Sequence, residues 1–266
     1  MVSGKQHSKT GKQNKHPVAP KKPKFKKPNK NQTKPAHKNN GAAPQPEAIT
    51  PPQQLSFFIN EYQSTNRIQL SSLELESIKD TCILELPQGL AQDASTICEH
   101  MKAAFGQSWR HQLCEKQILE GKIEPGNPAL LVISLSALRS LELYRGLRPF
   151  SKECPIVKLF SKHMKVEDQV STLKNRVNIA TGTPSRIKKL IDMEVLGLSR
   201  LKVIVLDMHT DVKGYSLLSL PQIRDEFWDL YKSYFHQRVL EGDLRICLYG
   251  PTPVIPRGKK KIINDH

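Results

Sequence analysis

Apolar residues with two different periods alternate along the second half of the chain. Ala129–Ile133 is an uninterrupted apolar run, which is typical of a strand buried on both faces. Further strands are expected at Pro155–Phe160, Val177–Ala180, Leu201–Leu206 and Leu244–Leu248. Between them, apolar residues recur every three or four positions, as on one face of a helix, over 135–144, 166–173, 187–191 and 223–234. This alternation predicts an α/β fold with a mostly parallel sheet flanked by helices.

The preceding region, residues 51–127, has a more helical pattern. Its large apolar side chains recur at helical spacing, first at Phe57, Phe58 and Tyr62 and then at Ile97, Met101 and Phe105. We expect this region to pack on the sheet or to complete the same domain. Trp228 lies beside Phe227 in a helical stripe, and we expect it in the core rather than on the surface as a stacking platform for bases.

Charge is unevenly distributed over the 266 residues, whose formal net charge is +16. Residues 1–50 contain 12 Lys, 7 Pro and a single acid, Glu47, and residues 257–266 carry a net charge of +3. Because residues 1–50 hold few large apolar side chains, burial there cannot offset the entropy of ordering the chain. The sequence therefore predicts a disordered Lys/Pro-rich arm (1–50), one folded and nearly neutral domain (51–256) and a basic tail (257–266).

The arm carries a dense lysine cluster at Lys21, Lys22, Lys24, Lys26 and Lys27. Such a cluster binds phosphates through counterion release, without sequence specificity, and is also typical of a nuclear import signal. A merely solubilising tail is the alternative interpretation, although acidic residues would serve solubility equally well. We expect these lysines to contact nucleic acid.

Several classes of protein are disfavoured by the sequence. The amino-terminal segment lacks the apolar run of a secretory signal, and no stretch approaches the length of a membrane span. The five cysteines are widely spaced and contain no Cys-x-x-Cys pair, so we expect free, mostly buried thiols in a reducing compartment. A zinc site is conceivable at Cys98, His100, His111 and Cys114, but their spacing matches no standard finger, and we expect no metal.

The carboxyl ends of the predicted strands are where an open parallel sheet binds ligands. After the third strand, Thr183 and Pro184 predict a helix start, with a hydroxyl cap followed by proline at the first helical position. Free amide groups there, beside Ser185 and the guanidinium of Arg186, form a ready anion site. The alternative is ordinary helix capping with a solvated Arg186. Lys162 and Lys165 follow the second strand, where they are either phosphate ligands or part of a solvated face.

The order of these elements resembles the first RecA-like domain of DEAD-box RNA helicases. Thr183–Arg186 is similar to the helicase motif Thr-Pro-Gly-Arg, and the strand "VIVLDMHTD" is similar to the one ending in Asp-Glu-Ala-Asp. "YGP" lies where Ser-Ala-Thr would be, and "ALLVISLSALRSLEL" resembles the segment carrying Pro-Thr-Arg-Glu-Leu-Ala, with Arg139 close to its arginine. The resemblance implies a single RecA-like, P-loop-NTPase-like domain whose Thr-Pro-Ser-Arg element contacts the RNA backbone.

The departures from the helicase pattern argue against catalysis. A Gly-x-x-x-x-Gly-Lys-Ser/Thr loop is missing, and in Glu120–Ile123 the Gly-Lys pair is followed by an isoleucine that cannot ligate a metal. Met208 replaces the second acid of Asp-Glu-Ala-Asp, and Thr210 replaces the last. Asp207 alone cannot both hold a metal ion and activate water. We therefore expect no ATP hydrolysis, no cofactor and no small-molecule substrate, and no second RecA-like domain after Pro256.

A closer resemblance concerns the CMS-type ribosomal small-subunit homologue family. It is carried by "KLFSKHMKVEDQV", "TGTPSRIKKL", "LKVIVLD" and "IRDEFWDL". The family's layout, a charged low-complexity segment followed by one degenerate RecA-like domain, matches this chain over residues 55–256. The resemblance implies a nucleolar, hence nuclear, protein of the 90S small-subunit processome that acts in pre-rRNA processing and 40S subunit assembly. The partners it implies are pre-rRNA and processome proteins, with no membrane.

Two interpretations of the domain remain open. In the first, it is a non-enzymatic RNA-binding scaffold that keeps the backbone-gripping half of a helicase, with Thr183, Ser185 and Arg186 in contact with RNA and Arg139 beside them. Lys162 and Lys165 would add to this surface. In the second, it is a protein–protein interaction module built on a pseudo-helicase fold, which the near-zero net charge of the body favours, because RNA-binding surfaces are usually basic.

Overall fold

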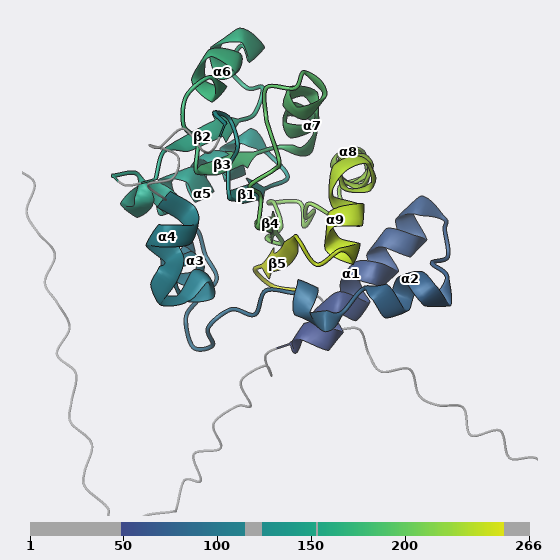
Figure 1. Cartoon of the computed structure of the whole chain (residues 1–266). Coiled ribbons are helices and arrows are strands. Elements are labelled where there is room, and N and C mark those ends of the chain that lie inside the picture. The colour runs from purple at the N-terminus through teal and green to yellow at the C-terminus, as the bar shows by residue number, and fades with distance from the viewer. Residues whose placement is uncertain (1–48, 115–123, 153, 253–266) are drawn as a thin grey trace, which may run out of the picture. The chain divides into compact units, whose positions relative to one another are not determined.

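The computed structural model describes residues 49–114, 124–152 and 154–252 of the chain. Contacts divide the chain into Met1–Gln45 and Pro46–His266, and all described residues belong to the second unit. Its sheet has the strand order β2-β3-β1-β4-β5, and every pairing is parallel (Figure 1). The strands are β1 (Leu130–Ile133), β2 (Ile156–Leu159), β3 (Ile179–Gly182), β4 (Val203–Asp207) and β5 (Arg245–Tyr249). The predicted α/β fold with a parallel sheet is thus confirmed.

Helices cover both faces of this sheet (Figure 1). One face packs against α3 (Ile97–Phe105), α4 (Trp109–Cys114) and α5 (Ala137–Leu147). The other packs against α1 (Pro51–Asn66), α6 (Val166–Leu173), α7 (Pro184–Asp192), α8 (Pro221–Leu230) and α9 (His236–Leu240), with a π-helical turn at Tyr231–Phe235 between the last two. The short helix α2 (Ser72–Ser77) follows α1 and buries none of its residues.

Strand side chains alternate between two hydrophobic cores, one on each face. In β1, Leu131 and Ile133 enter the core with α7 and α8, whereas Leu130 and Val132 enter the core with α3 and α5. All four are fully buried, which explains why the strand has an uninterrupted apolar run rather than an alternating pattern.

The third strand lies two residues later than predicted. β3 begins at Ile179 because this residue pairs with Leu130 of β1 and Ile156 of β2, so the three strands start in register. It ends at Gly182, where a Cβ atom would overlap the carbonyl oxygen of Leu159 on β2. The glycine therefore permits the close approach of the two strands just before α7 begins.

The region before β1 packs on the sheet and belongs to the same body, as expected. Phe58 and Tyr62 of α1 have their ring centroids 5.2 Å and 5.3 Å from that of Trp228 in α8. Trp228 is 1% exposed, which confirms its predicted place in the core. Ile83 forms an isolated parallel bridge with Ile246, so the chain extends the sheet beyond β5 before it enters α3.

The thiols differ from the prediction in one pair. Cys114 and Cys154 form a disulfide that joins the end of α4 to the residues before β2, with the Cα atoms 4.9 Å apart, so the expectation of free cysteines is wrong for these two. Their separation of 40 residues gave no sign of this proximity. The other three, Cys82, Cys98 and Cys247, are free and buried as predicted.

Burial is expected to make the free thiols inert in the native protein. It raises the pKa of Cys82 to about 11 and that of Cys247 to about 12, so almost no thiolate, the reactive form, is present at neutral pH. We expect iodoacetamide at pH 8 to leave both unmodified in the folded protein and to alkylate both in denaturant, as read by mass spectrometry of peptides. Rapid alkylation of Cys247 in the native protein would contradict this burial.

Among the described residues, no helix combines the length and apolarity needed to cross a bilayer.

Candidate functional site

The carboxyl ends of β1 and β4 mark the point where the chain connections diverge. From β1 the chain runs through α5 on one face towards β2, and from β4 it runs through α8 on the other face towards β5. This divergence is where an open parallel sheet forms its ligand crevice.

A cluster of charged side chains lies at this point. The carboxylate of Asp207, at the end of β4, is fully buried. Arg139, in the first turn of α5, donates from Nε to Asp207 Oδ2 at 2.9 Å and from Nη2 to Asp207 Oδ1 at 3.0 Å. His209 Nδ1 lies 2.8 Å from Asp207 Oδ1, and Arg139 Nη1 donates to Glu142 Oε2 at 3.0 Å.

Arg139 is thereby engaged within the protein. Burial alone would lower the pKa of its guanidinium, but the hydrogen bonds and charge of Asp207 and Glu142 outweigh this and raise the pKa above its usual range. A two-pronged ion pair of this kind is among the strongest side-chain contacts. An incoming phosphate would therefore compete with Asp207 for Arg139. The pairing of Arg139 with Asp207 was not predicted from the sequence.

The predicted helix start at Thr183 lies at the carboxyl end of the adjacent strand β3. Thr183 is the N-cap residue of α7 and Pro184 its first helical residue, as predicted. The predicted hydroxyl cap is absent, however, because the Thr183 side chain accepts no hydrogen bond from the helix, and the side chain itself is buried. Ser185 is exposed, and the first turn of α7 contains no acidic residue.

Arg186 reaches back from α7 to the connection between β2 and α6. Its Nη1 donates to Gln169 Oε1 at 2.7 Å and to the carbonyl oxygen of Met164 at 3.3 Å. Gln169 belongs to α6 and is 1% exposed. Arg186 is half-buried by these contacts. It is therefore not the fully solvated side chain that the sequence left open as an alternative.

The connection between β2 and α6 presents basic side chains to solvent. Lys162, His163 and Lys165 are all exposed. His163 has a left-handed backbone conformation, with φ at 58°, and the amide of Met164 donates to the carbonyl oxygen of Ser161 at 3.2 Å to close the turn. Sequence reasoning identified the two lysines but missed His163, whose conformation has no sequence signal.

The structure thus places the predicted residues in two groups. Thr183, Ser185 and Arg186 lie next to Lys162 and Lys165, because β2 and β3 are neighbouring strands with the same direction. Arg139 lies with Asp207 and His209 at the β1–β4 divergence. The remaining candidates, Lys21, Lys22, Lys24, Lys26 and Lys27, lie outside the described residues, as do Glu120–Ile123 and the basic tail.

The connection that leads into α3 is stabilised by hydrogen bonds within Asp93–Thr96. Asp93 Oδ1 accepts hydrogen bonds from the amides of Ser95 and Thr96 at 2.8 Å and 3.2 Å, and from the Ser95 hydroxyl at 2.6 Å. The bonds from Ser95 hold the pKa of the Asp93 carboxyl below its usual range. The hydroxyl of Tyr249 donates to the Asp93 carbonyl oxygen at 2.8 Å, which ties this connection to β5.

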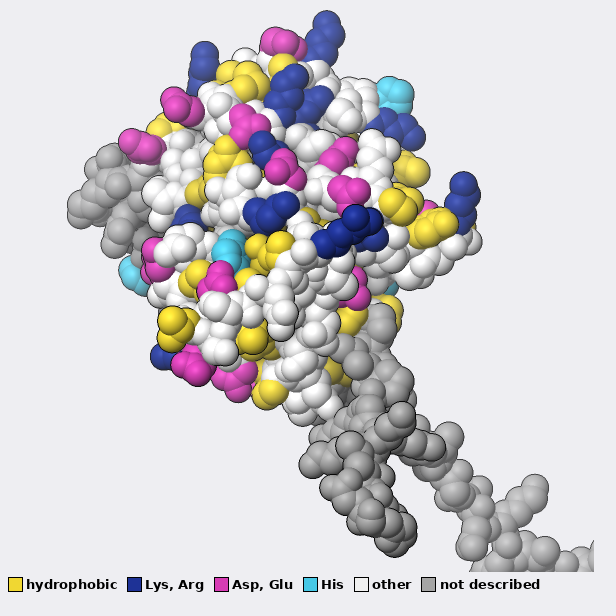
Figure 2. Space-filling view, turned by 90° about the vertical axis from the view of Figure 1, so that its right-hand side faces the viewer, with side chains coloured by type: hydrophobic (Ala, Val, Ile, Leu, Met, Phe, Trp, Pro, Cys, Tyr) yellow, Lys and Arg dark blue, Asp and Glu magenta, His cyan; other side chains and the backbone are white. Residues whose placement is uncertain are grey.

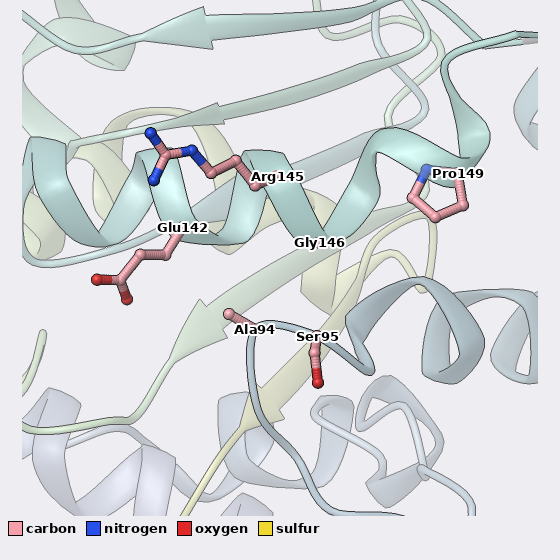
Figure 3. A pocket seen from close by; sticks show the side chains of 6 residues that line it. All are labelled: Ala94, Ser95, Glu142, Arg145, Gly146 and Pro149. Atoms are coloured by element: carbon pink, nitrogen blue, oxygen red, sulfur yellow. The ribbon is translucent and has the colours of Figure 1, made fainter.

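A pocket of about 450 Å³ lies between this connection and α5, beside the point where the two are in contact (Figure 3). Its lining consists of Ala94, Ser95, Glu142, Arg145, Gly146 and Pro149. The contact is made at Gly146, where a Cβ atom would overlap the carbonyl oxygen of Ala94. The pocket offers one cation and one carboxylate, and no cluster of three or more potential metal ligands occurs in the part of the chain that the structure describes.

The surface over α7, α8 and α1 is not uniformly basic. Figure 2 shows Lys and Arg side chains interspersed with Asp and Glu on this face, without a single large patch of one sign. This agrees with the nearly neutral composition of residues 51–256.

A family model, CMS1, described as the U3-containing 90S pre-ribosomal complex subunit, matches residues 3–249 of the chain. Protein CMSS1 of Homo sapiens is 32% identical over 183 residues, which is 67% of this chain and 61% of that protein. Protein CMSS1 of Xenopus laevis is 30% identical over 77% of this chain and 70% of its own length. Protein CMS1 of Chaetomium thermophilum is 34% identical, over 59% of this chain and 63% of its own. The chain thus spans between 61% and 70% of the length of these relatives.

Two solved structures of similar arrangement are yeast proteins. One is the DEAD-box splicing factor Prp28, with 15% identity and a TM-score of 0.36 over 52% of this chain and 33% of that one. The other is Dbp5 bound to Nup159, Gle1, IP6 and ADP, with 14% identity and a TM-score of 0.37 over 74% and 46%. At these TM-scores neither structure bears on the function of this chain.

Proposed function

The chain belongs to the CMS1 family, the U3-containing 90S pre-ribosomal complex subunit, and from this premise we propose that it binds pre-rRNA as a non-enzymatic scaffold component of the small-subunit processome. Its role would be in pre-rRNA processing and 40S subunit assembly, in the nucleolus. Its partners would be pre-rRNA and other processome proteins.

The observation that carries the RNA-binding proposal is the grouping of exposed hydroxyl and basic side chains at the ends of β2 and β3. Ser185 and Arg186 lie in the first turn of α7, and Lys162 and Lys165 lie on the neighbouring connection. A helix N-terminus favours anions through its free amides and its dipole. A sugar-phosphate backbone fits such an edge without any reading of bases.

The N-termini of α3, α5 and α6 are less suited to phosphate. The Asp93 carboxylate lies just before α3, where it accepts from the amides of Ser95 and Thr96, and the hydroxyl of Ser136 caps α5. Two acids, Glu167 and Asp168, lie in the first turn of α6. The N-terminus of α7, like that of α8, has neither a side-chain cap nor an acid, and the exposed lysines of the neighbouring β2–α6 connection support α7 as the place of backbone contact.

The same geometry supports a non-enzymatic role. The Asp93 carboxylate accepts from the amides of Ser95 and Thr96 just before α3, so a negative charge already lies near the start of this helix. Asp207 is buried and paired with Arg139 and His209, so it does not face a crevice as a free metal ligand. Met208 and Thr210, which take the positions of acids in the helicase motif, supply no carboxylate.

A second candidate function, protein–protein docking without RNA contact, has its own supporting observation. Several apolar side chains are exposed on connections at the carboxyl edge of the sheet. Leu138 is 62% exposed at the start of α5, and Val212 is fully exposed on the connection after β4, with Tyr215 at 40%. Exposed apolar residues of this kind are common in interaction surfaces.

RNA binding by the full chain at several salt concentrations separates the two functions. We expect replacement of both Lys162 and Lys165 by alanine to lower the slope of log affinity against log salt by about 0.7 per lysine for single-stranded RNA. Fluorescence anisotropy of a labelled RNA measures this slope. The basic segment before residue 50 contributes equally to the salt slopes of the parent protein and the variant, so its contribution cancels in the comparison.

The matched control removes two lysines near the amino ends of the strands, on the side of the sheet opposite to Lys162 and Lys165. Lys174 follows α6 and Lys202 precedes β4, and both are exposed. Their replacement by alanine removes the same charge, and we expect a smaller change in slope. Equal changes in the salt slope of the two double variants would remove the support for RNA contact at the carboxyl ends of β2 and β3. If neither double variant lost RNA affinity and both still associated with the pre-ribosomal particle, the result would favour the docking function.

A further inference from the structure

We propose that the body grips RNA through the turn Ser161–Lys165 between β2 and α6, and that Arg186 is a positioning residue for this turn rather than a ligand of phosphate. This inference rests on the proposed RNA-binding function and assigns different roles to residues that the sequence analysis grouped together. It also adds His163, which carries no assigned role, to the contact surface.

Arg186 is the first link in a chain of hydrogen bonds that ends at the turn. Its Nη1 donates to the carbonyl oxygen of Met164, within the turn, and to Gln169 Oε1. The Gln169 acceptor is buried, since Gln169 is 1% exposed. If Arg186 turned towards a phosphate, the buried Gln169 oxygen would lose its donor, and an unsatisfied buried polar group is costly.

Gln169 is the second link, and it seals the outer edge of the sheet. Its Nε2 donates to the carbonyl oxygens of Lys158 and Phe160, each at 3.0 Å. These two carbonyls alternate with that of Leu159, which accepts from the amide of Thr183 next to β3. They therefore point away from β3, and Gln169 takes the place that a further strand would have. Its side chain fixes where β2 ends and the turn begins.

The turn itself has a conformation that needs such support. His163 has φ at 58°, which is uncommon for any residue other than glycine and is retained only where neighbouring groups hold it. With the backbone so held, Lys162, His163 and Lys165 are all exposed. A turn fixed in advance loses less entropy when it binds, so its basic side chains grip a phosphate chain more tightly than a mobile loop would.

Crosslinking of the intact, unmodified chain tests the assignment directly. A single-stranded RNA containing 4-thiouridine is crosslinked by light, and the modified residues are located by mass spectrometry. We expect crosslinks within Ser161–Lys165 and none at Arg186. Crosslinks at Ser185 or Arg186, with none in the turn, would overturn the assignment while leaving the RNA-binding function in place. Crosslinks confined to residues 1–50 would overturn RNA contact by the folded body, and with it the assignment, and would leave RNA binding to the basic arm.

A double-mutant cycle in the full chain tests the positioning role. Gln169 is buried and cannot touch RNA, so Gln169→Met should weaken RNA binding only if the chain of hydrogen bonds matters. We expect Gln169→Met and Arg186→Met each to weaken binding about tenfold, and the double variant to be no weaker than Arg186→Met alone. Additive losses, or a Gln169→Met protein with full affinity, would show that Arg186 acts on RNA directly.

Two further measurements separate positioning from simple loss of stability. Lys189→Met removes a charge from the same helix without touching Gln169, and we expect it to keep more than half of the affinity. Amide hydrogen exchange should show faster exchange at Met164 in Arg186→Met and Gln169→Met at temperatures well below unfolding. A lowered melting temperature with unchanged affinity of the folded protein would reduce both residues to a structural role and overturn the proposal.

Discussion

Replacing Arg139 with alanine is expected to lower the free energy of unfolding by about 3–5 kcal/mol, because it leaves the buried carboxylate of Asp207 without its cationic partner. Asp207 is fully buried and accepts two hydrogen bonds from Arg139. His209, which lies 2.8 Å away and is partly exposed, offers a single hydrogen bond in compensation. Urea unfolding followed by circular dichroism measures the change.

Two control variants make this expectation specific. Glu142→Ala removes only the exposed partner of Arg139, and we expect a loss of at most about 0.5 kcal/mol. Replacing both Arg139 and Asp207 by leucine removes the buried charges together, and we expect it to be less destabilising than Arg139→Ala. If Arg139→Ala cost no more than Glu142→Ala, the ion pair would not be a main support of the β1–β4 junction.

The ion pair also bears on how the fold is used. The β1–β4 divergence is where a parallel α/β fold ordinarily binds its ligand, and here protein side chains bind one another at that place. The exposed basic groups lie instead on the ends of β2 and β3, nearer the edge of the sheet. This displacement agrees with a protein that contacts an extended polymer along its edge rather than a small molecule in its crevice.

The strands and most helices were predictable because buried positions are apolar and recur with the period of each element. Ala129–Ile133 and Val203–Leu206 are apolar at every position, and both belong to central strands covered on both faces. The start of α7 was predictable because Thr183 and Pro184 constrain the backbone locally. The contribution of Ile83 to the sheet was missed, because one bridging residue in a mostly irregular segment has no period.

The candidate site was predictable in its composition but not in its pairings. The sequence placed Lys162, Ser185 and Arg186 at strand ends, and parallel strands brought those ends together. It gave no strand order, however, and it did not indicate that Arg139 pairs with Asp207, 68 residues away. Such contacts depend on tertiary packing, which no local pattern records.

The second large effect is expected at the core between α1 and α8, where Trp228→Ala should lower the free energy of unfolding by about 3–5 kcal/mol. The indole ring is 1% exposed and contacts the rings of Phe58, Tyr62, Phe227 and Tyr231, with centroids 4.8–5.6 Å away. Its Nε1 has no hydrogen-bond partner among the described residues, so the loss is one of packing alone.

The chain offers a matched control, because Trp109 is its only other tryptophan. Trp109 is half-buried on the opposite face of the sheet, where its ring centroid lies 5.2 Å from that of Phe150, and we expect Trp109→Ala to cost at most about 2 kcal/mol. Each variant leaves one tryptophan as a fluorescent probe. In Trp228→Ala, the fluorescence of Trp109 should report unfolding at the same lowered urea concentration as circular dichroism, because the two cores share one sheet. If Trp109 kept its original transition, the two faces would unfold separately, and the single-domain interpretation of residues 51–256 would be wrong.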